Sequence, residues 1–216
     1  MIKKDSFKNE IKLGTYGVIK GANYYLVAAC EDKDFALQAL GYTLEKVILY
    51  CTSLGLRTVW LGGTFNRGDF AKAINLKDNE ILPIVSPVGY EGGKKSLLAS
   101  LIGNNKNNRK KYLELFFNES FNIPLSIENA KEYGEALEMV RLAPSAVNRQ
   151  PWRIIKVNKD IHVYTNGKVD TNKIDIGIAL CHFDLYTKEK GINGEFKFMD
   201  VNIQSKYKYV ISWIRK

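Results

Sequence analysis

The chain has 216 residues, with 32 Lys and Arg against 23 Asp and Glu, so its net charge is +9 with neutral histidines. Its 45% hydrophobic and 12% aromatic residues supply enough apolar surface for a folded core, which excludes an intrinsically disordered chain. No stretch approaches the roughly 18 apolar residues of a transmembrane helix, and residues 1–7 lack the apolar region of a signal peptide. We therefore expect a cytoplasmic protein of one large domain or two small ones.

The cysteines and histidines limit the chemistry that side chains can supply. Cys30, Cys51 and Cys181 are far apart and form no CxxC pair, so neither a zinc site nor a disulfide framework is expected. His162 and His182 belong to no HExxH motif; we expect the first at the surface and the second packed in a helix. No catalytic residue and no metal ligand is therefore assigned, and in an enzyme of this composition a bound cofactor would carry the chemistry.

The basic charge raises nucleic acid as a possible partner. Its densest stretch is residues 106–111, which we interpret as a polar linker running into a short helix over 112–117. Elsewhere the lysines alternate with Asp and Glu. This pattern favours a solvated lysine-rich surface over a nucleic-acid-binding face.

The first half of the chain predicts strands and helices in alternation. In chain order these are a strand over 24–29, a helix over 35–54, a strand over 56–61, a short helix over 70–74 and a strand over 80–88. Asp34 is a candidate N-cap of the long helix, and Gly55 stands where a glycine would end it. Gly62 and Gly63 end the second strand, and Pro83 and Pro87 interrupt the third.

The second half predicts a similar mixture of elements. They are a helix over 127–142, a hairpin of strands over 153–157 and 161–165, a helix over 173–190, a strand over 195–199 and an edge strand over 207–214. Ser126 is a candidate N-cap of the first of these helices, and Pro144 stops it because proline disfavours helix in the residue before it.

A repeated spacing of glycines links the two halves. Gly41 is followed by Leu-Tyr and then Gly55, and Gly177 is followed at the same offsets by Leu-Tyr and then Gly191. This spacing suggests two copies of one α+β unit within the chain. We accordingly divide the chain into a first half over 1–103, a linker with a short helix over 104–126 and a second half over 127–216.

Two segments carry groups that suit ligand binding. Residues 141–152 place a hydroxyl, two amides and a guanidinium between two prolines, and none of these loop groups ionises near pH 7. Such a loop fits a planar heterocycle with carbonyl and imide edges, and fits equally well a helix–strand connection whose polar groups cap the backbone. Gly62 and Gly63 would let the backbone approach a ligand closely, or would simply form a tight turn.

At these segments the sequence resembles the nitroreductase family. Residues 143–152, Ala-Pro-Ser-Ala-Val-Asn-Arg-Gln-Pro-Trp, resemble its flavin-binding loop, and residues 41–63 resemble its helix–strand–Gly-Gly segment. Residues 24–29 and 175–179 also look like that family, and the likeness spans about residues 15–200. It points to the branch with two nitroreductase-like halves fused in one chain. The resemblance implies an α+β fold with a central, mostly antiparallel sheet flanked by helices and an internal pseudo-two-fold duplication.

The resemblance also implies an FMN site to which both halves contribute. It assigns cofactor binding to two groups of residues and to two lysines near the phosphate: Pro144, Ser145, Ala146, Asn148 and Gln150 of the loop, Leu61, Gly62 and Gly63 at the strand end, and Lys94 and Lys95. Family members usually open with an Arg-Arg-Ser segment that grips the FMN phosphate. Nothing in residues 1–34 matches this segment.

The function implied by the resemblance is that of an FMN-dependent oxidoreductase. NADH or NADPH would supply a hydride to the flavin, and a nitroaromatic or quinone-like small molecule would accept the electrons. The missing arginine segment leaves open a degenerate or truncated, flavin-free member that acts as a binding or regulatory module, and the basic charge leaves open a nucleic-acid-binding domain. We expect no membrane partner, and either a monomer of fused halves or a homodimer.

Overall fold

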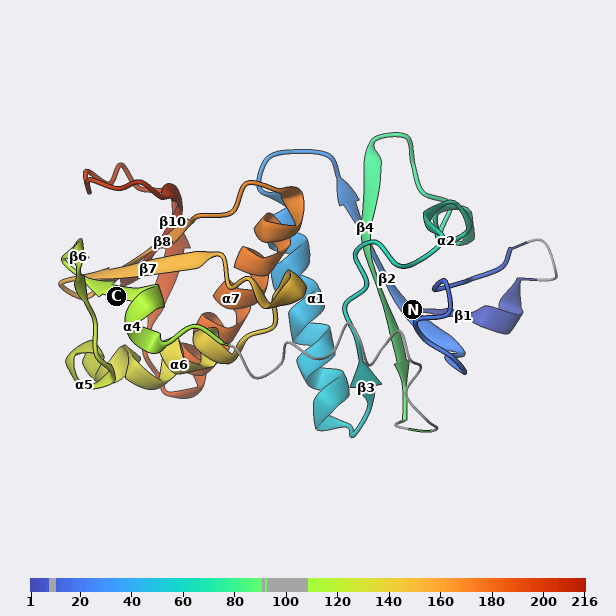
Figure 1. Ribbon diagram of the computed structural model, residues 1–216, viewed down its shortest axis with the longest axis horizontal. Coiled ribbons are helices and arrows are strands. Elements are labelled where there is room, and N and C mark those ends of the chain that lie inside the picture. The colour runs from blue at the N-terminus through green and yellow to red at the C-terminus, as the bar shows by residue number, and fades with distance from the viewer. Residues whose placement is uncertain (8–10, 91, 93–108) are drawn as a thin grey trace. The chain divides into compact units, whose positions relative to one another are not determined.

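A computed structural model describes residues 1–7, 11–90, 92 and 109–216, and the chain divides into two compact units, Met1–Asn107 and Asn108–Lys216. The described strands form one sheet in each unit, ordered β1-β2-β4-β3 in the first and β6-β5-β7-β8-β10-β9 in the second (Figure 1). The α+β class with antiparallel sheets is confirmed, and the strands divide between two sheets instead of forming one central sheet.

The first unit is built around two long antiparallel strands. Its elements are β1 (Ile2–Lys3), β2 (Tyr24–Glu31), α1 (Ala36–Ser53), β3 (Arg57–Thr58), α2 (Arg67–Ala73) and β4 (Glu80–Gly89). Strands β2 and β4 pair along their length, with a register shift between Ala28 and Cys30. Pro83 falls opposite that irregularity, where a strand tolerates the loss of an N–H donor, so β4 is not interrupted.

Helices cover both faces of this sheet. Figure 1 shows α1 along one face of β2 and β4 and α2 on the other. On the α2 side, Phe70 is fully buried, and its ring centroid lies 5.2 Å from that of Tyr25 and 5.6 Å from that of Phe65. Leu61 and the β4 residues Leu82 and Val85 belong to the same core, which therefore holds Leu61 against β4.

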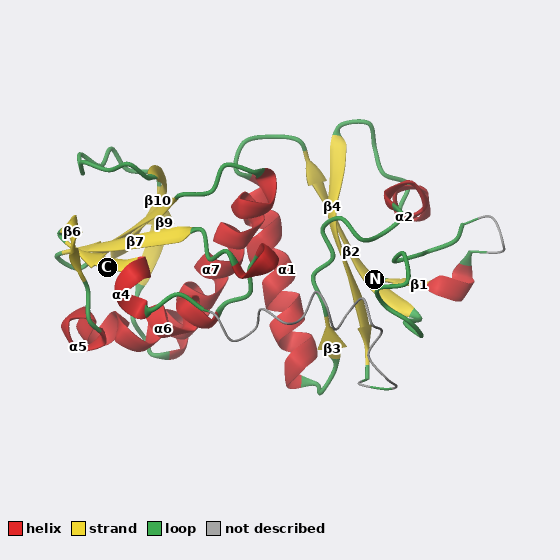
Figure 2. Cartoon of the chain, viewed as in Figure 1, coloured by secondary structure: helices red, strands yellow, loops and turns green. Residues whose placement is uncertain are grey.

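The second unit contains the other α-helices and strands that the structure describes. They are α4 (Tyr112–Leu115), β5 (Phe116–Asn118), β6 (Ser120–Pro124), α5 (Ile127–Ala130), α6 (Gly134–Leu142), β7 (Trp152–Val157), β8 (Asp160–Thr165), α7 (Asp170–Glu189), β9 (Gly194–Lys197) and β10 (Lys208–Arg215). Residues 112–124 lie in the segment expected to be a linker with a short helix; besides the helix α4 they form two strands of this unit's sheet, and β5 pairs in parallel with β7. Figure 2 shows α6 and α7 side by side, and their residues are in contact.

Aromatic side chains fill the core of the second unit. Trp213 packs edge-on against Tyr133 and Phe183, with ring centroids 5.7 and 5.4 Å apart. Strand β10 lies between β8 and β9, so the expected edge strand is an interior strand, which explains why Trp213 is buried. A smaller cluster of Phe117, Ile155 and Tyr164 forms a separate part of the core.

Several element boundaries differ from those expected, for local reasons. Lys131 has a φ of 56°, so the expected helix over 127–142 is broken between α5 and α6, although Ser126 does cap α5 through the Asn129 N–H. Helix α1 begins after Phe35, whose φ is 63°, and Asp34 is not its N-cap. The strand expected over 56–61 is reduced to β3 and a single bridge at Leu61.

The same order of elements occurs in both units. The first unit runs β2-α1-β3-β4, with α2 inserted before β4, and the second runs β8-α7-β9-β10. In each sheet the last of these strands lies between the other two. Both helices end at a left-handed glycine, Gly55 with φ 76° and Gly191 with φ 68°. In each case the N–H of the glycine and that of the following residue donate to carbonyls of the last turn, as in a Schellman motif. A duplication of one unit stays a prediction.

Candidate functional site

The predicted flavin loop connects α6 to β7 and has a strained backbone. Three of its non-glycine residues adopt the left-handed conformation: Val147 with φ 45°, Asn148 with φ 56° and Gln150 with φ 48°. This conformation is unfavourable for a β-branched residue, and each such residue costs about 1–3 kcal/mol unless its surroundings hold it. Val147 is 70% exposed, so contacts elsewhere in the loop must impose its shape.

Gln150 supplies one set of these contacts. Its side chain is fully buried; Oε1 accepts from the Lys110 N–H at 2.7 Å, and Nε2 donates to the Arg141 carbonyl at 2.9 Å. Its own N–H donates to Ser145 Oγ at 3.0 Å. Both ends of the Gln150 amide are thus used within the protein. Its side chain holds the loop, and any contact to a cofactor would come from its backbone.

Ser145 and Asn148 are brought together in one turn of the same loop. The Asn148 N–H donates to the Ser145 carbonyl at 3.0 Å, and both residues are half-buried. Because Ser145 Oγ accepts the Gln150 N–H, its proton can be donated elsewhere. Pro144 and Ala146 flank the turn and are also half-buried. The turn therefore presents polar groups at the surface of the second unit.

Two basic residues that the sequence interpretation placed in a linker also hold this loop. Arg109 Nη1 donates to the carbonyls of Arg141 and Ala143, at 3.0 and 2.8 Å, and Lys110 Nζ donates to the Arg149 carbonyl at 2.7 Å. These carbonyls end α6 or belong to the loop, where cations are favourable. The signal that could have found them was the position of the basic run, directly before the short helix of the same half.

The surroundings of the loop are electropositive. Burial, together with the neighbouring Arg141, lowers the pKa of Arg109. Burial and the neighbouring Arg153 lower the pKa of Lys110. A cation whose pKa is lowered partly by a neighbouring cation marks a place where a negative group is favoured.

A cavity of about 340 Å³ adjoins the loop. Its lining consists of two cations, two amides and small or apolar residues: Arg149, Lys168, Asn166, Asn172, Pro151, Gly167 and Val169. Its volume is near the lower end of the range for ligand sites, about 300–1,000 Å³. The cavity thus offers room for part of a flavin-sized molecule and positive charge for an anionic group.

A buried carboxylate from α7 lies against the loop. Asp175 is 3% exposed; its Oδ1 accepts from the Ala146 N–H at 2.9 Å and its Oδ2 from Asn172 Nδ2 at 3.4 Å. Burial raises the pKa of Asp175 to about 6, although both hydrogen bonds and the charge of Arg149 act in the opposite direction. The site as folded thus includes an acid that the sequence of the loop alone does not supply.

Leu61, Gly62 and Gly63 belong to the first unit. The Leu61 N–H and carbonyl bond to the carbonyl and N–H of Val85 at 3.0 and 3.1 Å. Neither glycine has a positive φ; among the described residues, a Cβ at Gly62 would meet only Ile84 Cδ1 at 3.5 Å, and one at Gly63 would meet nothing within 4 Å. The packing of the described part of the unit therefore does not require glycine here. Lys94 and Lys95 lie outside the described residues.

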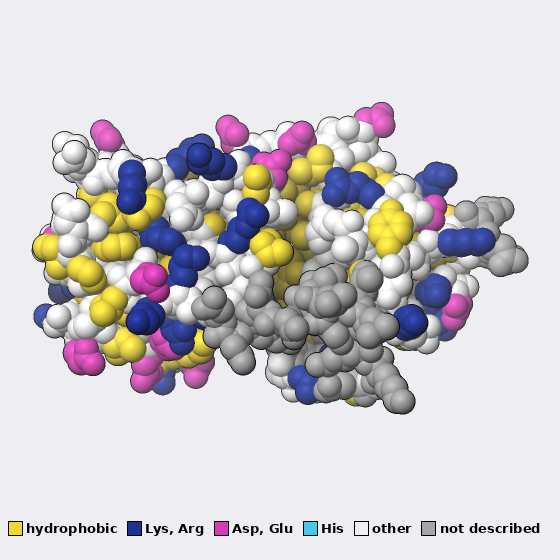
Figure 3. All heavy atoms as spheres, viewed as in Figure 1, with side chains coloured by type: hydrophobic (Ala, Val, Ile, Leu, Met, Phe, Trp, Pro, Cys, Tyr) yellow, Lys and Arg dark blue, Asp and Glu magenta, His cyan; other side chains and the backbone are white. Residues whose placement is uncertain are grey.

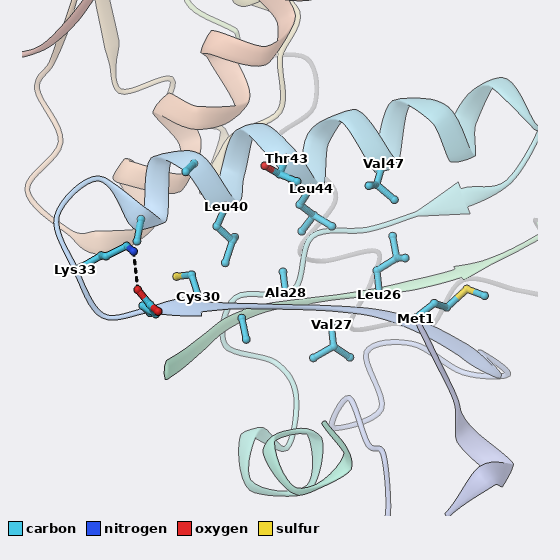
Figure 4. A pocket seen from close by; sticks show the side chains of 14 residues that line it. Met1, Leu26, Val27, Ala28, Cys30, Lys33, Leu40, Thr43, Leu44 and Val47 are labelled. Carbon is cyan, nitrogen blue, oxygen red and sulfur yellow. Dashed lines mark hydrogen bonds and ion pairs between the residues drawn. The ribbon is translucent and has the colours of Figure 1, made fainter. Parts of the chain in front are cut away.

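A larger cavity, of about 540 Å³, lies in the first unit between α1 and β2. Figure 4 shows Leu40, Leu44 and Val47 of α1 facing Leu26 and Ala28 of β2, with an ion pair between Lys33 and Glu31 at one end. This lining is almost entirely apolar, and its cation is already paired. We therefore assign the candidate site to the smaller cavity, whose polar groups can orient a ligand.

The remaining candidates for chemistry are structural. His162 is 8% exposed, so the expected surface position is wrong, and its Nδ1 lies 2.7 Å from Ser212 Oγ in the interior strand β10. Among the described residues no group of three His, Cys, Asp or Glu side chains is arranged to hold a metal ion. On the face seen in Figure 3, Lys and Arg are interspersed with Asp and Glu. In the part of the chain that the structure describes, no helix is long and apolar enough to cross a membrane.

Comparisons with known proteins bear on the family and on the fold. The chain matches the family described as "Putative TM nitroreductase" over residues 1–187. It is similar in structure to a putative nitroreductase from Thermotoga maritima, with a TM-score of 0.60 and 20% sequence identity, covering 100% of this chain and 79% of that one. At this identity the structural likeness concerns the fold. No curated protein matches the chain.

Proposed function

Because the chain belongs to the nitroreductase family described as "Putative TM nitroreductase", we propose that it is an FMN-dependent oxidoreductase. It would take a hydride from NADH or NADPH and reduce a nitroaromatic or quinone-like small molecule. The observation that carries the proposal is the strained loop 144–151, which presents polar groups beside a cavity with two cations. Strain held in place by surrounding contacts is typical of binding sites.

The groups around the loop fit the chemistry of a flavin mononucleotide. Its ring edge carries carbonyl and imide groups, which Ser145 and Asn148 would contact through hydroxyl, amide and backbone groups. Its phosphate is an anion, for which Arg149 and Lys168 line the adjoining cavity. Residues 1–34 lack an Arg-Arg-Ser segment, but the side chains of Arg109 and Lys110 add positive potential near the loop.

FMN, when bound, would supply the hydride and electron transfer, so no protein nucleophile is needed. The role of the chain is to hold the ring and exclude side reactions. Gly62 and Gly63 suit this role, because they leave the backbone open to close approach by a ligand, and no described neighbour in their own unit requires glycine. Lys94 and Lys95 stay candidates for the phosphate on the grounds of charge alone.

One observation favours the flavin-free alternative, a binding or regulatory module. The Arg109 and Lys110 side chains already donate to carbonyls of α6 and the loop. A loop whose cations are used in this way can keep its shape without a cofactor. The two functions differ in a single measurable property, which is the binding of FMN.

FMN binding tests both functions directly. The purified chain is titrated with FMN, with flavin fluorescence and visible absorbance as readouts, and NADH or NADPH oxidation is then followed with a quinone or nitroaromatic acceptor. We expect stoichiometric FMN binding and acceptor-dependent oxidation. A colourless protein that binds no added FMN would exclude the proposed enzyme and support the module.

A pair of variants locates the binding. Asn148→Ala removes an amide from the loop, and Asn158→Ala removes one from the β7–β8 turn; both residues have a positive φ, so the backbone cost is matched. We expect FMN affinity to fall at least tenfold only in Asn148→Ala, because only Asn148 is near the proposed ring site. Equal affinities would place the ring elsewhere.

A further inference from the structure

A chain of hydrogen bonds connects the first turns of α7 to the strained loop. The Val169 N–H donates to Asn172 Oδ1 at 3.3 Å, Asn172 Nδ2 donates to Asp175 Oδ2 at 3.4 Å, and the Ala146 N–H donates to Asp175 Oδ1 at 2.9 Å. Asn172 and Asp175 are both buried, one helical turn apart. The series therefore ends on the backbone of the residue that precedes the left-handed Val147.

We propose that Asp175 is a positioning residue that fixes the loop 144–151 in its ligand-binding conformation by accepting the Ala146 N–H. The identity of the ligand rests on the proposed function, whereas the role of Asp175 in the conformation of the loop is independent of that function. The Asp175 carboxylate is not itself part of the cavity lining; it contacts the backbone N–H of Ala146 and the side chain of Asn172, so it acts through these two residues.

The surroundings of Asp175 fix its orientation. Asn172 accepts from the backbone of residue 169, which directs its Nδ2 toward Asp175. The Asn172 side chain is packed so closely against Gly167 that a Cβ there would lie 2.4 Å from Asn172 Cβ. A glycine at 167 therefore makes room for Asn172, and Asn172 in turn holds the carboxylate. Both belong to the lining of the cavity beside the loop.

The strain in the loop makes such an anchor necessary. Val147 and Asn148 follow Ala146 directly, and both have left-handed backbones. If the Asp175 carboxylate were removed, the Ala146 N–H would lose this acceptor, and the loop would be free to relax toward ordinary backbone angles. An acceptor carried by a helix of 20 residues is a rigid support, more precise than another loop would provide.

Hydrogen–deuterium exchange of the peptide covering residues 143–151 tests the role of Asp175 in the full chain. Three variants are compared with the wild type: Asp175→Ala, which removes the acceptor; Asp175→Asn, which keeps one carbonyl oxygen toward Ala146; and Asp184→Ala, a control. Asp184 is another buried carboxylate of α7, and it bonds Lys188 at 2.7 Å. FMN affinity is measured on the same samples by fluorescence titration.

We expect loop exchange to rise at least tenfold and FMN affinity to fall at least tenfold in Asp175→Ala. Asp175→Asn should show intermediate values, and Asp184→Ala should leave both near wild type. Loop exchange in Asp175→Ala equal to that of the wild type, or no greater than that of Asp184→Ala, would overturn the positioning role. If the wild type binds no FMN, the proposed function fails, while the exchange data still decide whether Asp175 holds the loop.

Discussion

Replacing Asp175 by Asn should change how the stability of the second unit depends on pH. Burial raises the pKa of Asp175 from its ordinary 3.8 to about 6. The folded state therefore binds more protons than the unfolded state between these values, and the stability contributed by this group is full below pH 3.8 and is lost as the pH rises through 6. One pKa unit corresponds to about 1.4 kcal/mol, so the ionised carboxylate costs the folded protein about 3 kcal/mol.

The Asn variant cannot titrate at this position. The unfolding free energy of Asp175→Asn minus that of the wild type should therefore grow by about 2 kcal/mol between roughly pH 4.5 and pH 7.5. Other carboxylates cancel in this difference, and so does any constant cost of the changed hydrogen bond. The sign is unusual, because a variant of a site residue should gain relative stability toward neutral pH.

Urea unfolding followed by tryptophan fluorescence measures this difference. Trp152 and Trp213 are buried in the second unit, and a Trp60→Phe background removes the signal of the first. A difference that stays constant with pH would show that burial does not raise the pKa of Asp175. A difference that shrinks as the pH rises would show that its hydrogen bonds outweigh desolvation, and either result would refute the reasoning.

Three other substitutions test the site. Gln150→Ala should lower the unfolding free energy by about 2–3 kcal/mol, because it leaves the Lys110 N–H and the Arg141 carbonyl without that partner; a loss below about 0.5 kcal/mol in urea unfolding would contradict the buried network. Gly63→Ala should leave the unfolding free energy within about 0.5 kcal/mol of the wild type, since a Cβ there meets no described atom within 4 Å. It should weaken FMN binding severalfold by titration; unchanged affinity would show that this backbone is not part of the site. Arg109→Gln should lower the unfolding free energy by about 1–2 kcal/mol and raise hydrogen exchange at the end of α6, because the two carbonyls there lose their donor. A variant with unchanged stability and exchange would show that these two contacts are unimportant.

The features that the sequence predicted correctly depend on residues that are close together in the chain. Pro144 ends α6 because it restricts the residue before it, and Gly55 and Gly191 end their helices because they accept a left-handed backbone. The β7–β8 hairpin likewise follows from a short polar turn between two apolar runs. The nitroreductase family and the α+β class were also confirmed.

What could not be predicted depends on residues distant in sequence. Lys110 reaches Gln150, and Asp175 reaches Ala146, only in the folded unit, so neither appears in a local motif. The interior position of β10 depends on its pairing with β9, which the alternation of its own side chains does not reveal. Residues 116–118 and 120–124 become strands because β5 pairs with the edge of β7, a contact that the linker-and-helix interpretation of this segment did not include.

The long-range contacts of the loop also determine when it can form. Its supports join residues 40 positions apart at Lys110 and Gln150, and 29 apart at Ala146 and Asp175. Bringing the ends of such long segments together lowers the entropy of the chain before any contact stabilises the loop. These contacts therefore form later than the helices and the β7–β8 hairpin. During refolding, the ability to bind a ligand should therefore appear after most of the secondary structure. Ligand binding would then report that the whole stretch from residue 109 to residue 175 has come together correctly.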